Sequence, residues 1–157
     1  MTDAAGIAVR PVGHVRSPRT EHGSRGWGGV TARIEMDAAR FGPETLQGLD
    51  VFSHVMVVFH FHRVAEDDYD IEPRRPRGNP DWPEVGVFAR PGRERPNRIG
   101  VTVSRLLSVD GTTLTVEGLD ALDGTPVLDI KPHFTGFAPR GAVSEPDWSQ
   151  ALMRDYW

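Results

Sequence analysis

The stretch from residue 51 to residue 62 most constrains the fold, because it has the residue types and the two-residue period of a β-strand. Valine and phenylalanine dominate it, and both are enriched in strands. Side chains two apart on a strand share a face, so one side carries His54, Met56, Val58, His60 and His62. The other side carries Val55, Val57, Phe59 and Phe61. This stretch is predicted to be the strongest strand of the chain.

Further strand signals recur along the chain between glycine and proline turns. Strands are predicted over residues 7–15, 30–36, 85–89, 99–109, 112–119 and 127–131, with Asp110-Gly111 and Asp123-Gly124 as turns. Residues 19–29 hold four glycines, and residues 64–82 are acidic and then rich in proline and arginine. Both segments are predicted to be loops. Residues 41–50 are compatible with one or two helical turns.

The last segment has a different period. Trp148, Leu152 and Tyr156 recur at helical spacing, and Pro146 suits a first turn, which predicts a helix over residues 146–157. Many short strands and one terminal helix predict a mainly β fold, a single β-barrel with short helices and a C-terminal helix. A chain of 157 residues suits one domain. We expect that domain over residues 1–157, with the barrel at about 7–134 and an extension with the helix at 135–157.

Composition indicates the cellular compartment in which we expect the protein. The chain has no cysteine, which excludes disulfides and thiolate chemistry and fits a reducing cytosol. No apolar run approaches the ~20 residues that span a bilayer, and residues 1–8 have no basic region before an apolar stretch. We expect a cytoplasmic protein with neither a signal peptide nor a membrane partner.

Arginine is concentrated between residues 74 and 98, where seven arginines stand against three acids. The planar guanidinium group suits carboxylate and phosphate ligands. The segment is therefore either a rim that binds anions or a solvated loop, and both interpretations stay open.

Two histidines and a carboxylate raise the question of a metal site. His60-x-His62 followed by Glu66 resembles the first metal-binding motif of cupins, and such a set can hold a divalent ion. A companion motif with a further histidine is missing later in the chain. We therefore predict no metal site and hydrogen-bonded histidines. The sequence also lacks a P-loop, a dinucleotide-binding glycine motif and a nucleophile elbow.

Three carboxylates surround the turn near residue 123: Asp120, Asp123 and Asp129. They could accept hydrogen bonds from an ammonium group or from ribose hydroxyls, and they could equally cap the turn itself.

An ordered set of segments resembles the TrmO/TsaA-like family. The matching segments are Val12-Gly13-His14-Val15-Arg16-Ser17-Pro18, Leu49-Asp50-Val51-Phe52-Ser53-His54, Gly86-Val87-Phe88-Ala89, Arg95-Pro96-Asn97-Arg98-Ile99-Gly100 and residues 119–132, which include Asp-Gly-Thr-Pro and Asp-Ile-Lys-Pro. They occur in the family's order and at similar spacing.

The resemblance implies a β-barrel methyltransferase that uses S-adenosylmethionine and forms a homodimer with cofactor pockets near the subunit contact. The family's best-known activity methylates the exocyclic amine of threonylcarbamoyl-adenosine beside the tRNA anticodon. The implied acceptor is therefore tRNA, with a small metabolite as the alternative. Carried over by position, the implied cofactor contacts are His62, Arg63, Arg95, Leu106, Leu119, Asp120, Ala121, Leu122 and Asp123.

Methyl transfer from a sulfonium chiefly requires that the reacting atoms be held in line. An exocyclic amine becomes acidic as it attacks, so a nearby carboxylate or imidazole could take its proton. Asp120, Asp123 and His133 are the candidates for this catalytic role.

Two departures from the family pattern concern the acceptor. Residues 20–29 lack the Pro-Arg-Gln-Pro-Gly-like segment of members close to the tRNA enzymes, and the usual Arg-Pro-Asn-Pro-Ile-Gly reads Arg-Pro-Asn-Arg-Ile-Gly at residues 95–100. A cupin-like metal protein and a non-catalytic module that binds S-adenosylmethionine remain as other classes.

Overall fold

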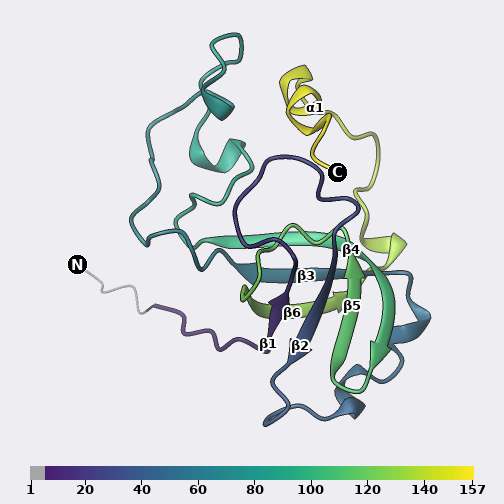
Figure 1. Ribbon diagram of the computed structural model, residues 1–157. Helices are drawn as coiled ribbons and strands as arrows, with labels where there is room; N and C mark the ends of the chain where they lie inside the picture. Colours follow the sequence, from purple (N-terminus) through teal and green to yellow (C-terminus); the bar gives the residue numbers. More distant parts are fainter. Residues whose placement is uncertain (1–5) are drawn as a thin grey trace.

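Six antiparallel strands close into a barrel in a computed structural model that describes residues 6–157 (Figure 1). The order around the barrel is β1-β2-β5-β4-β3-β6. The strands are β1 (Gly13–Arg16), β2 (Thr31–Met36), β3 (His54–His60), β4 (Ile99–Asp110), β5 (Thr113–Glu117) and β6 (Pro126–Pro132). The mainly β barrel predicted from the sequence is confirmed.

The apolar face of β3 fills the interior of the barrel. Val55, Val57 and Phe59 are buried, whereas the residues that alternate with them are partly exposed. They form one apolar cluster with inward side chains of the other strands, among them Val15, Ile34, Leu114, Val116 and Val127. The two-residue period that predicts β3 thus also separates its inner face from its outer face.

Several predicted strands are shorter than the runs that predict them. The strand β3 covers residues 54–60 of the predicted 51–62, because Val51 ends a 3₁₀ turn and His62 lies in the turn beyond the strand. The strand β1 begins at Gly13: the N–H of Val12 still donates to the carbonyl of Val127 on β6 (2.7 Å), whereas Ile7 and Val9 farther upstream are exposed. The strand β5 ends at Glu117, where Gly118 takes a φ of +81°, a conformation that glycine adopts without steric penalty.

The strand predicted over residues 85–89 is wrong. Only Val85 pairs, in a single antiparallel bridge with Arg74. A single bridge offers no ladder to the following residues, so the N–H of Ala89 donates to the carbonyl of Gly86 (3.0 Å) instead. Residues Val87–Ala89 consequently form a 3₁₀ turn, η4.

The remaining helical elements are short. The turns predicted over residues 41–50 are confirmed as η1 (Pro43–Leu46) and η2 (Leu49–Val51), and two more 3₁₀ turns are η3 (Pro76–Gly78) and η5 (Thr135–Phe137). The C-terminal helix is confirmed as α1 (Asp147–Met153), shorter than its period suggests.

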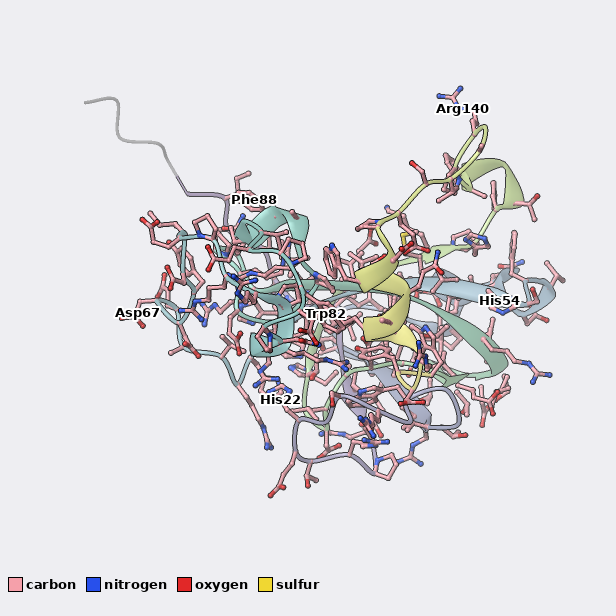
Figure 2. The ribbon with its side chains drawn as sticks, turned by 90° about the horizontal axis from the view of Figure 1, so that it is seen from above. His22, His54, Asp67, Trp82, Phe88 and Arg140 are labelled. Carbon is pink, nitrogen blue, oxygen red and sulfur yellow. The ribbon has the colours of Figure 1, made fainter. Side chains whose placement is uncertain are left out.

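The helix α1 packs on its own chain. Leu152 is buried, and the ring of Trp148 lies 6.3 Å from that of Trp82, which Figure 2 shows beside the helix. Tyr156 follows the helix and lies in the turn after it.

Three connections meet at one end of the barrel, and we call this the long-loop end: residues 17–30 between β1 and β2, residues 61–98 between β3 and β4, and residues 118–125 between β5 and β6. The first two and α1 rise above the strands in Figure 1. The opposite end carries the connections 37–53 and 111–112 and the first residues after β6, from which the chain returns to α1 at the long-loop end. Within residues 6–157, no helix has the length and apolar character needed to cross a membrane.

Candidate functional site

The barrel topology gathers most of the predicted site residues at the long-loop end. His62, Arg63 and Arg95 lie on the connection between β3 and β4, and residues 119–123 lie on the connection between β5 and β6. Figure 2 looks onto this end and shows His22, Trp82 and Phe88 on the connections that overlie the barrel. Residues that are far apart in sequence therefore converge on one site.

His62 lies directly beyond β3 and contacts the last connection. Its Nδ1 shares a hydrogen bond with Oγ1 of the buried Thr125 (3.3 Å). Burial lowers the pKa of His62, and the nearby positive charge of Arg63 lowers it further. Near neutral pH this imidazole is uncharged, so one of its ring nitrogens is free of a proton.

Asp123 joins the last connection to the first. One carboxylate oxygen, Oδ1, accepts a hydrogen bond from the backbone N–H of Ser17 (3.1 Å), and the backbone N–H of Asp123 donates to the carbonyl of Arg19 (2.8 Å). The N–H of Gly124 donates to the carbonyl of Val15 (2.8 Å). The side chain of Asp123 therefore links the last connection to the first and does not cap its own turn, in which the N–H of Thr125 donates to the carbonyl of Leu122 (3.1 Å). The second carboxylate oxygen has no hydrogen bond within residues 6–157.

Asp120 is held by two hydroxyl groups. Thr102 on β4 donates to Oδ1, and Tyr156 of the C-terminal segment donates to Oδ2. Burial and the negative charge of Asp120 both raise the pKa of Tyr156, so the phenol stays protonated. The contact between Asp120 and Tyr156 is not predictable from the sequence, because no local pattern links residues 36 positions apart.

Three arginines of the long connection donate hydrogen bonds to backbone carbonyls and thereby fix the loops. Arg63 donates to the carbonyl of Thr20, Arg95 to that of Arg90 (2.8 Å), and Arg98 to that of Val64 (2.9 Å). A guanidinium group has five N–H donors, so Arg63 and Arg95 keep donors for an anionic ligand.

A histidine that the sequence analysis missed also lies among these cations. Burial lowers the pKa of His22, and Arg93, Arg63 and His62 lower it further. The glycine-rich first connection offered no pattern that singled it out.

A family model described as the tRNA-methyltransferase O N-terminal domain matches residues 15–138. The chain belongs to this family. A probable S-adenosyl-L-methionine-binding protein of Pyrococcus abyssi is 35% identical over 140 residues, which cover 87% of this chain and 73% of that protein. The tRNA (adenine(37)-N6)-methyltransferase of Mus musculus is 41% identical over 93 residues, 59% of this chain and 21% of the mouse protein.

A crystal structure of TrmO from Pseudomonas aeruginosa has the same fold, with a TM-score of 0.72 and 31% sequence identity over 90% of this chain and 62% of that chain. The chain described in this structure therefore spans about a fifth of the mouse enzyme and less than two thirds of the solved TrmO chain.

The apolar positions carried over from the family do not expose their side chains. Leu119, Ala121 and Leu122 are buried, and the first two belong to the barrel core. Only their backbone groups are available to a ligand at the long-loop end. Leu106 lies on β4 beyond the part that pairs with β3: its N–H donates to the carbonyl of Ser53 (2.8 Å), and it lies opposite Val116, next to the last residue of β5.

His133 is also separated from the other catalytic candidates. It follows β6 at the opposite end of the barrel, where its backbone N–H donates to the carbonyl of His54 (3.0 Å). Asp120 and Asp123 therefore lie at the long-loop end without His133.

The opposite end carries an open aromatic groove of about 590 Å³, lined by Phe52, His133, Phe134, Thr135, Gly136 and Phe137. The rings of Phe52 and Phe134 stack at 5.4 Å, and Phe137 lies 5.7 Å from Phe134. Phe137 is 80% exposed, so the stack ends on a ring that is open to solvent.

The cupin-like grouping of His60, His62 and Glu66 does not form a metal centre. Within residues 6–157, no three histidine, aspartate or glutamate side chains gather closely enough to hold a metal ion. His60 lies on the outer face of β3, whereas His62 lies in the turn beyond it.

Proposed function

We propose that this chain is a methyltransferase that takes its methyl group from S-adenosylmethionine and transfers it to an adenosine of tRNA. The observation that carries the proposal is the convergence of His62, Arg63, Arg95, Asp120 and Asp123 at the long-loop end of a barrel that belongs to the tRNA-methyltransferase O family. Relatives named as S-adenosylmethionine-binding proteins and as tRNA methyltransferases support it.

The donors and acceptors at this end suit the chemical groups of the cofactor. Asp120 and Asp123 offer carboxylate oxygens to an ammonium group or to ribose hydroxyls, and Arg63 and Arg95 offer N–H groups to a carboxylate. The backbone of Leu119, Ala121 and Leu122 completes the set. When bound, the cofactor supplies an activated methyl group on a sulfonium.

The chain's own contribution to the reaction is positioning and proton removal. A fixed site can lower the barrier by several kcal/mol by holding the amine in line with the methyl group. We assign the acceptance of the amine proton to Asp120 or Asp123, because the free oxygen of Asp123 and the remaining lone pairs of Asp120 lie at this end. His133 lies at the opposite end of the barrel, so within one chain it cannot accept this proton.

Two surface features favour RNA over a small molecule as the acceptor. Unpaired bases stack on aromatic side chains in RNA-binding proteins. The groove of Phe52, Phe134 and Phe137 presents such rings at the end of the barrel away from the cofactor site, so it would hold a different part of the RNA from the adenosine that is methylated. The excess of arginine over acid between residues 74 and 98 suits a phosphate backbone.

A homodimer and a cytoplasmic location complete the proposal. The outer face of β4 exposes Ile99, Val101 and Val103, and the last two lie opposite Val58 and Met56 of β3. An apolar strip on a barrel wall is typical of a subunit contact. The absence of cysteine fits the cytoplasm.

The test is transfer of a labelled methyl group. The purified chain, labelled S-adenosylmethionine and tRNA that bears threonylcarbamoyl-adenosine are incubated, and the tRNA is digested to nucleosides. We expect label in the modified adenosine. Label in a small metabolite but not in tRNA would overturn the acceptor, and no transfer to either would leave a binding module.

A further inference from the structure

The contact between the C-terminal segment and Asp120 is the feature that the proposed reaction leaves unexplained. Asp120 follows β5 by three residues, Thr102 lies on β4, and Tyr156 lies beyond α1. The two hydroxyl groups take different oxygens of one carboxylate. This side chain is therefore fixed from the barrel wall and from the end of the chain at the same time.

The segment that carries Tyr156 is itself anchored. The N–H of Gly26 donates to the carbonyl of Asp155 (3.1 Å), and the N–H of Trp27 donates to the carbonyl of Tyr156 (2.9 Å). A Cβ added to Gly28 would lie 2.7 Å from the carbonyl carbon of Trp157, so the two backbones are packed closely. Since Trp27 is buried, the segment rests on a fixed part of the first connection.

Both groups that hold Asp120 are neutral. Among residues 6–157, its carboxylate forms no ion pair with arginine, lysine or histidine. An ionised carboxylate has about four lone-pair positions, and the two hydroxyls occupy two of them. The negative charge is thus oriented without being neutralised, which is the state that attracts a cationic ligand group.

We propose that Tyr156 and Thr102 are positioning residues that orient Asp120 toward a cationic group of the cofactor. This rests on the proposed function, because it assigns a role within the same site. The C-terminal segment then belongs to the cofactor site, and the hydroxyl group of Tyr156 acts by holding Asp120.

The experiment is a double-mutant cycle on cofactor affinity. Isothermal calorimetry with S-adenosylmethionine compares the wild type, Tyr156→Phe, Asp120→Asn and the double variant. The matched control is Tyr69→Phe, which removes the hydroxyl of the other tyrosine in the chain. We expect Tyr156→Phe to weaken binding about tenfold, the double variant to bind no more weakly than Asp120→Asn, and the control to bind like the wild type.

Three results would overturn the positioning role: unchanged affinity in Tyr156→Phe, effects of the two substitutions that multiply, or tighter binding in Tyr156→Phe, which would mean that the segment competes with the cofactor. Thr102→Val removes the other donor and provides a second measurement if Tyr156→Phe does not fold. We expect this variant to bind the cofactor more weakly than the wild type, and unchanged affinity would contradict the positioning role. Failure of the wild type to bind S-adenosylmethionine would contradict the proposed function. Binding by the wild type with unchanged affinity in both Tyr156→Phe and Thr102→Val would contradict the positioning role alone.

Discussion

Asp123 allows the structural and the binding roles of one side chain to be separated. Replacement by alanine removes the acceptor for the backbone N–H of Ser17 and leaves that donor unpaired in a partly buried place. An unpaired donor of this kind costs about 1–3 kcal/mol. For a chain of this size each kcal/mol shifts the melting temperature by about 2–4 °C, so Asp123→Ala is expected to melt about 2–12 °C below the wild type.

Asp123→Asn keeps a carbonyl oxygen for Ser17 but removes the negative charge. We expect it to melt within about 4 °C of the wild type, because a neutral hydrogen bond contributes about 0.5–1.5 kcal/mol and is retained. A lost charge-assisted hydrogen bond to the cofactor is worth about 1.5–3 kcal/mol, which is about 10- to 150-fold in the dissociation constant.

Thermal unfolding followed by circular dichroism and calorimetric titration with S-adenosylmethionine give the two quantities. Asp110→Asn, at the hairpin on the opposite end of the barrel, is the matched control and should change neither. Full affinity in Asp123→Asn would refute the binding role. A melting temperature for Asp123→Ala equal to that of the wild type would refute the structural one.

Three further predictions concern the fold, the histidines and the outer face. Gly100→Ala is expected to lower the free energy of unfolding in urea by about 1–3 kcal/mol, because the added Cβ would lie 2.5 Å from the ring of Phe59. The control is Gly86→Ala, which should be tolerated because the added Cβ would meet no atom within 4 Å. Equal stability of the two variants would contradict the packing around Gly100. Burial lowers the pKa of His22, His60 and His62 below 6.5, so the unfolded state binds more protons and stability should fall as the pH drops below about 6.5. Urea midpoints from about pH 7 to about pH 5.5 should show this loss, and a loss of the same size in His62→Gln would exclude a contribution from His62. Val101→Asp, at a side chain that is 56% exposed, should turn a dimer into a monomer in light scattering without unfolding it, and a wild type that is already monomeric would refute the proposed contact.

The sequence predicts the barrel because its signals are local. The alternation in β3 separates the buried Val55 and Phe59 from partly exposed neighbours, and the glycine turns divide the other strands. The segment at residues 85–89 misleads because it has the residue types of a strand without a partner for its backbone. Whether such a segment pairs depends on the path of the long connection, which no local pattern encodes.

The candidate site is predictable only as far as the chain order determines it. In an antiparallel barrel, alternate connections share one end, and this places His62 and Asp123 together. The same rule puts His133 at the other end. The contact of Tyr156 with Asp120 depends on how the segment after α1 folds back over the first connection, and a helical period that includes Tyr156 gives no indication of it.

Calorimetric titration of the purified wild-type chain with S-adenosylmethionine, combined with metal analysis of the same sample, tests the central claim most directly. We expect a saturable site with a dissociation constant in the micromolar range, which corresponds to a binding free energy of roughly −8 kcal/mol. Absence of binding at millimolar cofactor, together with stoichiometric zinc, iron or manganese, would contradict it.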